Sequence, residues 1–161
     1  MDPSNRREFF DRLGNRLNYS TLEDFYDITV DDVNANGGSA LLQSYYDSSL
    51  AQVFQDNYPN HIWQVWKFSQ KVRVGYWNIE GNQRDFMDEL GKQLGFQQMD
   101  DWYGITSKQI VYKKGGSRLL KTFGDSPSNL VTSVYKYHQW NGIQFKTLTN
   151  QRLKLSETNP L

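Results

Sequence analysis

Five cationic side chains lie close together in the second half of this 161-residue sequence, within a stretch that contains no aspartate or glutamate. The stretch runs from residue 102 to residue 124, and its cations are Lys108, Lys113, Lys114, Arg118 and Lys121. Cations that share one surface attract a polyanion, because each one that reaches a phosphate releases a condensed counterion. One alternative stays open: a lysine-rich face that is only solvated, although such a face more often mixes both signs of charge.

Candidates for catalysis are few. The sequence has no cysteine, which excludes thiol nucleophiles and thiolate metal ligands. His61 and His138 each precede a tryptophan by two residues, and we interpret them as side chains that close a turn, since a metal shared between them needs further ligands. No Gly-x-Ser-x-Gly, Walker A or Gly-x-Gly-x-x-Gly motif is present. The sequence therefore predicts a protein that is not an enzyme and uses no metal and no cofactor.

Aspartates at corresponding positions of the two halves of the chain are candidates for acid–base catalysis. Asp24 corresponds to Asp101, and Asp47 to Asp125, in the two halves of the chain. Acid–base catalysis uses such pairs. Each of these residues, however, stands at the start or end of an expected helix, where a carboxylate accepts backbone N–H groups or favours the positive end of the helix dipole. We interpret them as helix caps.

Composition and charge narrow the class of protein. Hydrophobic residues make up 37% of the chain and aromatic residues 15%, so rings must supply much of the core. The 18 Lys plus Arg balance 18 Asp plus Glu, which argues against coating nucleic acid with the whole surface but permits a local basic patch. No apolar run approaches the ~20 residues of a membrane span, and the start, MDPSNRREFF, lacks the apolar stretch of a secretory signal. We expect an intracellular protein of the nucleus or cytoplasm, with no membrane partner.

An internal repeat organises these residues. The segment that begins at Asn5 matches the segment that begins at Asn82 at an offset of 77 residues; the offset becomes 78 through two Gly-Gly-Ser stretches and then returns to 77. Both slips fall at expected loops, where one residue more or less costs little. We expect a first repeat unit over residues 1–68, an extended aromatic linker over 69–81, a second unit over 82–145 and a polar tail over 146–161.

Helical periodicity and capping residues predict an all-α fold. Phe9, Leu13 and Leu17 recur every four residues on one face. Thr21 and Thr29 are each followed three residues later by an aspartate, the spacing of a capping box. Further helices are expected to begin at serine caps, which are Ser39 and Ser49 in the first unit and Ser117 and Ser126 in the second. The result is a compact module of about five short helices, present in two tandem copies. Only IWQVWKF and VRV have the composition of a strand.

The basic cluster distinguishes the two units. The corresponding stretch of the first unit, residues 25–46, contains aspartates and no cation. Residues 1–77 carry 7 basic and 10 acidic side chains, a net charge of −3, and residues 78–161 carry 11 and 8, a net charge of +3. The cations fall on an expected helix, glycine turn and helix, the arrangement in which a helix-turn-helix presents one helix to a groove of DNA. Polar side chains at the start of the next helix are expected to touch the same groove, and they are Ser126, Ser128 and Asn129.

The repeat unit has a recognisable order of short motifs, each of which stands in one or both copies: a linker Trp, Asn-Gln-Arg, Leu-Gly, Asp-Trp-Tyr-x-Ile-Thr, Gly-Gly, Leu-Leu, Ser-Pro, Tyr-Pro and a closing Trp and Phe. This pattern resembles a tandem helical repeat of uncharacterised multi-copy proteins in microbial eukaryotes. The stretch SRLLKTFGDSPSNLV is also similar to the Phe-Gly-Ser loop and following helix of the DNA-binding repeats attached to homing endonucleases. That similarity implies a module that binds duplex DNA through Arg118, Lys121, Ser126 and Ser128. The first unit departs from it, with Ala40 and Gln43 in place of the two cations.

Two functions from different classes follow. The first is a nucleic-acid-binding module, with DNA favoured, whose five cations neutralise phosphates. The second is a protein-interaction or scaffold module, in which the acidic face of one molecule's first unit docks on the basic face of another molecule's second unit and so forms a head-to-tail homo-oligomer. The presence of five cations without an acid in one stretch favours nucleic acid as the partner.

Overall fold

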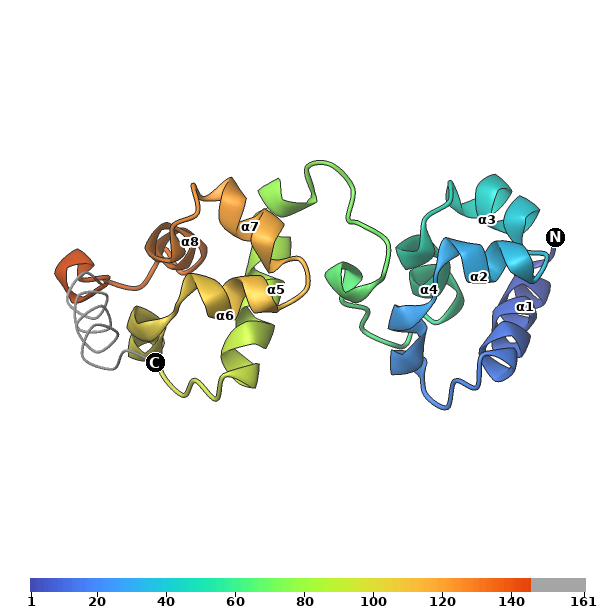
Figure 1. Ribbon diagram of the computed structural model, residues 1–161, viewed down its shortest axis with the longest axis horizontal. Helices are drawn as coiled ribbons and strands as arrows, with labels where there is room; N and C mark the ends of the chain where they lie inside the picture. Colours follow the sequence, from blue (N-terminus) through green and yellow to red (C-terminus); the bar gives the residue numbers. More distant parts are fainter. Residues whose placement is uncertain (146–161) are drawn as a thin grey trace, which may run out of the picture. The chain divides into compact units, whose positions relative to one another are not determined.

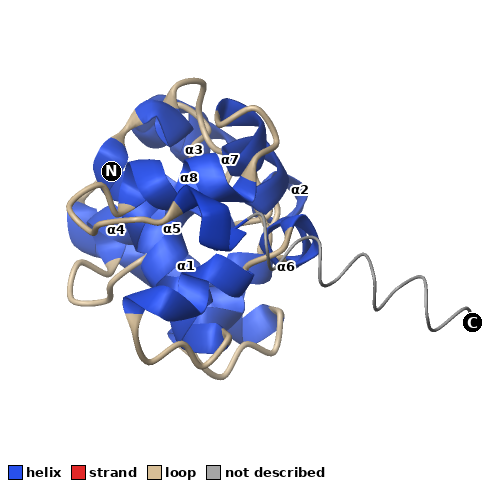
Figure 2. Ribbon diagram, turned by 90° about the vertical axis from the view of Figure 1, so that its left-hand side faces the viewer, coloured by secondary structure: helices blue, strands red, loops and turns tan. Residues whose placement is uncertain are grey.

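The computed structural model describes residues 1–145, and the polar tail expected over 146–161 lies outside the described residues. The chain divides into two compact units, Met1–Arg73 and a second unit that begins at Val74. Every regular element in the described part is a helix, as Figures 1 and 2 show, so the all-α class is confirmed. The strand-like stretch IWQVWKF contains instead a short 3-10 helix, η2 (Val65–Lys67). Among the helices of residues 1–145, none has the length and apolar character that crossing a membrane requires.

Each unit contains the same series of helices. In unit 1 they are α1 (Pro3–Arg16), η1 (Leu22–Asp27), α2 (Val30–Ala35), α3 (Ser39–Tyr46) and α4 (Leu50–Asn57). In unit 2 they are α5 (Glu80–Gln93), η4 (Met99–Gly104), α6 (Ser107–Tyr112), α7 (Gly116–Thr122) and α8 (Pro127–Val134). All bounds agree at the 77-residue offset except the end of α7, which is one residue shorter than α3. The second slip of the repeat therefore shortens a helix.

Capping boxes fix where the short helices begin. The Thr21 and Thr29 backbone N–H groups donate to the carboxylates of Asp24 and Asp32, at 2.8 and 2.9 Å. Both capping boxes are complete, as the spacing predicted. The N–H groups of Thr21 and Ser20 that point at Asp24 lower the pKa of its carboxyl group, because they stabilise the charged form. Asp24 therefore serves as a helix cap, as the sequence indicated.

The expectation that Ser39 and Ser117 cap the third helices is wrong. The capping positions are Gly38 and Gly115, without a side-chain hydrogen bond, and both serines already lie inside the first helical turn. The cause is close packing at the double glycine. A Cβ atom on Gly116 would lie 1.8 Å from the carbonyl oxygen of Ile110, so the chain enters α7 where no side chain fits.

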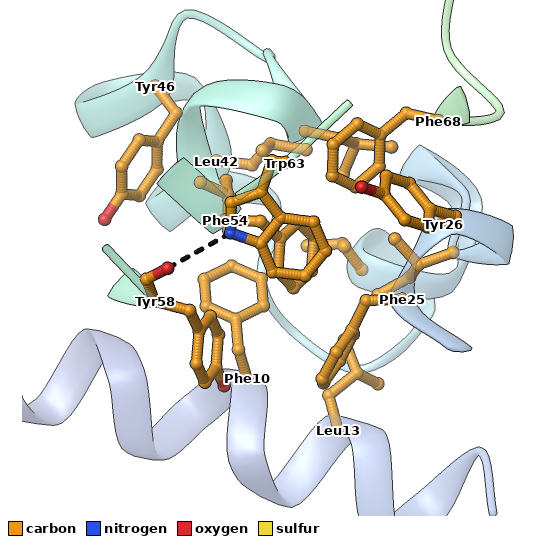
Figure 3. Packing of buried hydrophobic residues seen from close by; sticks show 14 of the residues in the cluster. Phe10, Leu13, Phe25, Tyr26, Leu42, Tyr46, Phe54, Tyr58, Trp63 and Phe68 are labelled. Atoms are coloured by element: carbon orange, nitrogen blue, oxygen red, sulfur yellow. Dashed lines mark hydrogen bonds between the residues drawn. The ribbon is translucent and has the colours of Figure 1, made fainter. Parts of the chain in front are cut away.

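Aromatic rings fill the core of unit 1, as Figure 3 shows. Phe54 on α4 is fully buried among them, and the Trp63 indole N–H donates to the carbonyl oxygen of Tyr58 at 3.1 Å. Unit 2 repeats this bond, from Trp140 to the carbonyl oxygen of Tyr135 at 2.9 Å. The indole polar group is thus satisfied inside each core, which lets a tryptophan pack there without a desolvation cost.

Two tyrosines connect the end of the last α-helix of each unit to the first α-helix. The Tyr58 hydroxyl donates to Asp11 on α1 at 2.5 Å, and the Tyr135 hydroxyl donates to Asp88 on α5 at 2.6 Å. Burial, together with these bonds to carboxylates, raises the pKa of both phenols. The same bond at the same offset shows that the two units share a packing arrangement as well as a helix order.

The boundary between the units falls within the expected linker. Ser69 donates from its backbone N–H to the Tyr26 carbonyl oxygen at 3.2 Å and so packs on unit 1. Trp77, in η3 (Tyr76–Asn78), is buried edge-on against Phe86 of α5, and its carbonyl oxygen accepts from Gln83 at 2.7 Å. The two ends of the linker stretch therefore belong to the cores on either side.

Candidate nucleic-acid interface

The helices α6 and α7 position the cations of the basic cluster. The two helices pack against each other, and their buried side chains are Ile110 on α6 and Leu119 and Leu120 on α7. Their joining turn contains Lys113, Lys114 and Gly115, with Gly115 in the left-handed conformation at a φ of 84°. With the apolar face of each helix turned inward, the polar positions point to solvent.

Arg118 and Lys121 lie on the exposed face of α7. They are three residues apart, which places their side chains on the same side of the helix. Within residues 1–145 neither side chain forms an ion pair with a carboxylate. Lys121 also stands in the last helical turn, where a cation stabilises the exposed carbonyl end of the helix dipole. This pair is the part of the expected site that the structure brings together most clearly.

Lys113 has a structural role in unit 2. Its ammonium group donates to the Gln93 side-chain oxygen at 3.0 Å and lies 5.7 Å from the centre of the Phe86 ring. At the matching positions of unit 1, Arg16 donates to the Asn36 side-chain oxygen at 3.3 Å. The cation and the amide have exchanged places, yet the bond between the two helices is kept. Lys113 therefore links α5 to α6 and does not depend on a phosphate to hold it.

Lys108 and Lys113 line one groove beside α6. The groove has a volume of about 600 Å³, and its walls are Leu90, Gln93, Leu94, Lys108, Gln109, Tyr112 and Lys113. Lys108 is exposed and, within the described residues, forms no ion pair. Lys114 is exposed in the turn before α7. The five cations thus divide between an α5–α6 groove, a turn and the outer face of α7.

The polar residues that were expected to contact DNA lie at the N-terminal cap of α8, and Ser126 forms that cap. The Ser126 hydroxyl accepts from the Asn129 backbone N–H at 3.2 Å and is 3.1 Å from the Ser128 hydroxyl. Ser49 caps α4 of unit 1 in the same way, accepting from Gln52 at 3.3 Å. Ser126 is therefore a cap in both the sequence and the structure, and among the three residues only the Asn129 side chain is exposed.

A second groove in unit 2 has its polar groups already engaged. It encloses about 720 Å³, and among the residues that line it are Arg84, Asp88, Trp102, Tyr135 and His138. Asp88 accepts from Tyr135, and the Arg84 guanidinium lies 5.6 Å from the centre of the Tyr135 ring. The same trio recurs in unit 1, with Arg7 5.0 Å from the ring of Tyr58. Such a repeated arrangement is part of the module's architecture.

Each of the two histidines makes its contacts within its own unit. The His61 imidazole lies 3.0 Å from Glu23, and that of His138 lies 3.5 Å from Asp100. Each ring also packs on the tryptophan two residues later, at 4.3 and 4.4 Å between ring centres. Within residues 1–145 no group of three or more ligand residues gathers around either histidine.

Sequence reasoning missed one exposed aromatic side chain in this region. Tyr112 at the end of α6 is 96% exposed, and Val111 beside it is 47% exposed. Unit 1 has Asn34 and Ala35 at these positions. The sequence signal that identifies them is an apolar or aromatic residue in one repeat where the other repeat has a small or polar one. Comparisons of the chain with protein-family models, curated proteins and solved structures give no match.

Proposed function

We propose that the chain is a nucleic-acid-binding module and that it binds through the cations of α6 and α7. The observation that carries the proposal is a set of exposed cations without carboxylate partners among the described residues: Lys108, Arg118 and Lys121. At the matching positions unit 1 has Asp31, Ala40 and Gln43. Because unit 1 builds the same helices without these cations, the fold does not require them. A polyanionic partner accounts for their presence.

Each cation has a defined part in this proposal. Arg118 and Lys121 contact phosphates from the outer face of α7, and Lys108 and Lys114 contact them from α6 and the turn. Lys113 is left out, because its bond to Gln93 already serves the fold. With four phosphate contacts, the log–log dependence of affinity on salt has a slope of about −3.6 for duplex DNA and about −2.8 for a single strand.

The test is binding of the full chain to labelled duplex and single-stranded DNA at two salt concentrations. Arg118→Glu combined with Lys121→Glu should weaken binding to every sequence and reduce the magnitude of the negative salt slope by about 2. Lys71→Glu combined with Arg73→Glu is the matched control, since both residues are exposed cations of unit 1 and the change in net charge is equal. No complex of the unmodified chain at about 50 mM salt would refute the proposal.

A second candidate function is head-to-tail self-association. Asp27 and Asp31 are exposed on η1 and α2 of unit 1, so an acidic face of one molecule has the charge to meet the α6–α7 cations of another. Light scattering distinguishes this function from the first. Self-association predicts a mass that grows with protein concentration, falls with salt and returns to that of a monomer in Asp27→Lys with Asp31→Lys. A monomeric mass at low salt removes this candidate.

A further inference from the structure

The groove between α5 and α6 has an apolar floor and one fully accessible aromatic ring. Leu90 of α5, Leu94 at the C-cap of α5 and Tyr112 at the end of α6 are among the residues that line it. The Tyr112 side chain is 96% exposed, so both faces of its ring are open to a ligand. Ala35 occupies the matching position of unit 1, at the end of the corresponding helix α2. The ring is therefore not needed to build or end the helix.

The side-chain amide of Gln109, a residue that lines the groove, has a donor without a protein partner among the described residues. The Gln109 side-chain oxygen accepts from the backbone N–H and the hydroxyl of Thr106, at 3.0 and 3.1 Å. These bonds hold the amide in place as part of the α6 capping box. Its NH₂ group, by contrast, makes no hydrogen bond within the described residues. The side-chain NH₂ group of Gln109 is therefore a fixed donor for a ligand that carries an acceptor on a flat polar edge.

The rim of the groove carries positive charge. Lys108 is exposed at the first turn of α6 and, within residues 1–145, has no carboxylate partner. Lys113 lines the groove as well, while donating to Gln93. These features of the groove are complementary to a nucleotide: an open ring, apolar walls, a fixed amide donor and a cation. A base supplies a face to stack and an edge that accepts hydrogen bonds, and its phosphate supplies the negative charge.

We infer that this groove takes an unpaired base, which stacks on Tyr112, accepts a hydrogen bond from Gln109 and directs its phosphate to Lys108. Unit 2 then prefers single-stranded or locally unpaired nucleic acid to a continuous duplex, since a paired base has no accessible face. This inference rests on the proposed function and specifies its ligand. An acidic peptide with an apolar side chain also fits the charge and the walls, but the fully exposed Tyr112 ring favours a flat partner that stacks on its face, as a base does.

The test uses the full chain and a single strand of about 12 nucleotides that contains one fluorescent adenine analogue. Stacking on Tyr112 should change the fluorescence of the analogue. Tyr112→Ala should remove that change and weaken single-strand binding by about 5- to 100-fold, the range for losing one base–aromatic stack. Tyr112→Phe should keep both, because it keeps the ring. Tyr137→Ala is the matched control, since Tyr137 is 88% exposed in the same unit and lies outside this groove.

The outcomes separate this inference from the proposed function. Duplex affinity should not change in Tyr112→Ala. If the unmodified chain binds DNA and Tyr112→Ala lowers neither affinity nor fluorescence change, the base-binding groove is refuted while the proposed function stands. If the chain binds neither strand form, both fail together. If it binds an acidic peptide with a central tryptophan through Tyr112 but no oligonucleotide, the groove is a protein-docking site and the inference is wrong.

Discussion

Units 1 and 2 contain the same series of helices and share several internal hydrogen bonds, yet the exposed residues of α2–α3 and α6–α7 differ. The bond from Tyr58 to Asp11 recurs from Tyr135 to Asp88, and the tryptophan bonds recur at the same offset. On the surface, Asp31 corresponds to Lys108. Features kept in both units are those that packing requires, whereas features found in one unit report what that unit does.

The pair that links the first two α-helices of each unit shows how packing and charge are separated. Arg16 donates to Asn36 in unit 1, and Lys113 donates to Gln93 in unit 2. The bond requires one cation and one amide but not a particular order. Reversing the order moves a positive charge from α1 in unit 1 to the end of α6 in unit 2 without losing the link. Surface charge therefore diverged at a position where the packing contact was kept.

The largest difference between the units is expected at the double glycines. Gly116→Ala should destabilise unit 2 by about 3 kcal/mol or more, because the new Cβ meets the backbone oxygen of Ile110 at 1.8 Å. Gly38→Ala should cost unit 1 about 1 to 3 kcal/mol, because its nearest atoms belong to the side chains of Val33 and Phe9, which can shift. Denaturant unfolding followed by amide hydrogen exchange in each unit measures both. Equal costs would show that the two glycine corners are packed alike.

Alkaline pH is expected to weaken both units. Tyr58 and Tyr135 have a pKa raised by burial, so above the ordinary value of 10 the unfolded phenol loses its proton while the folded one keeps it. The stabilisation that these two phenols contribute is therefore fully present below pH 10 and is lost as the pH rises above that value. Burial also raises the pKa of Tyr76 to about 12, so the contribution of this phenol to the stability of unit 2 is lost between pH 10 and about pH 12.

Single phenylalanine variants assign this loss to one unit at a time. Tyr58→Phe should make the stability of unit 1 less steeply dependent on pH, and Tyr135→Phe should do so for unit 2, each at a cost of about 1 kcal/mol at neutral pH. Unfolding midpoints measured between pH 8 and pH 12 check this. An unchanged slope in both variants would mean that other groups control alkaline unfolding.

The smallest effect is expected from the exchanged cation–amide pair. Lys113→Asn should cost unit 2 about 0.5 to 1 kcal/mol by removing the bond to Gln93. Adding Gln93→Arg recreates the order found in unit 1 and should restore most of that loss. A double-mutant cycle on the free energy of unfolding measures the coupling. Additive costs would show that the two positions do not interact.

The sequence could predict the parts of the fold that depend on neighbouring residues. The amphipathic first helix and the Thr21 and Thr29 capping boxes involve residues within a few turns of one another, and the 77-residue repeat shows that the same local patterns occur twice. The expected caps at Ser39 and Ser117 failed, because the approach of Gly116 to Ile110 depends on how two helices meet. The second slip of the repeat was visible in the alignment of the units, but it was expected in a loop, whereas the structure ends α7 one residue earlier than α3.

The sequence by itself determined the helix order, the duplication and the separation of charge between the units, because these are properties of residue type and spacing. Only the tertiary structure decided which cations are available. It joined Lys113 to Gln93 from another helix and placed Tyr112 with Leu90 at one groove. These contacts join residues that are distant in the sequence. They follow from which buried faces pack together, and no short pattern in the chain specifies that choice.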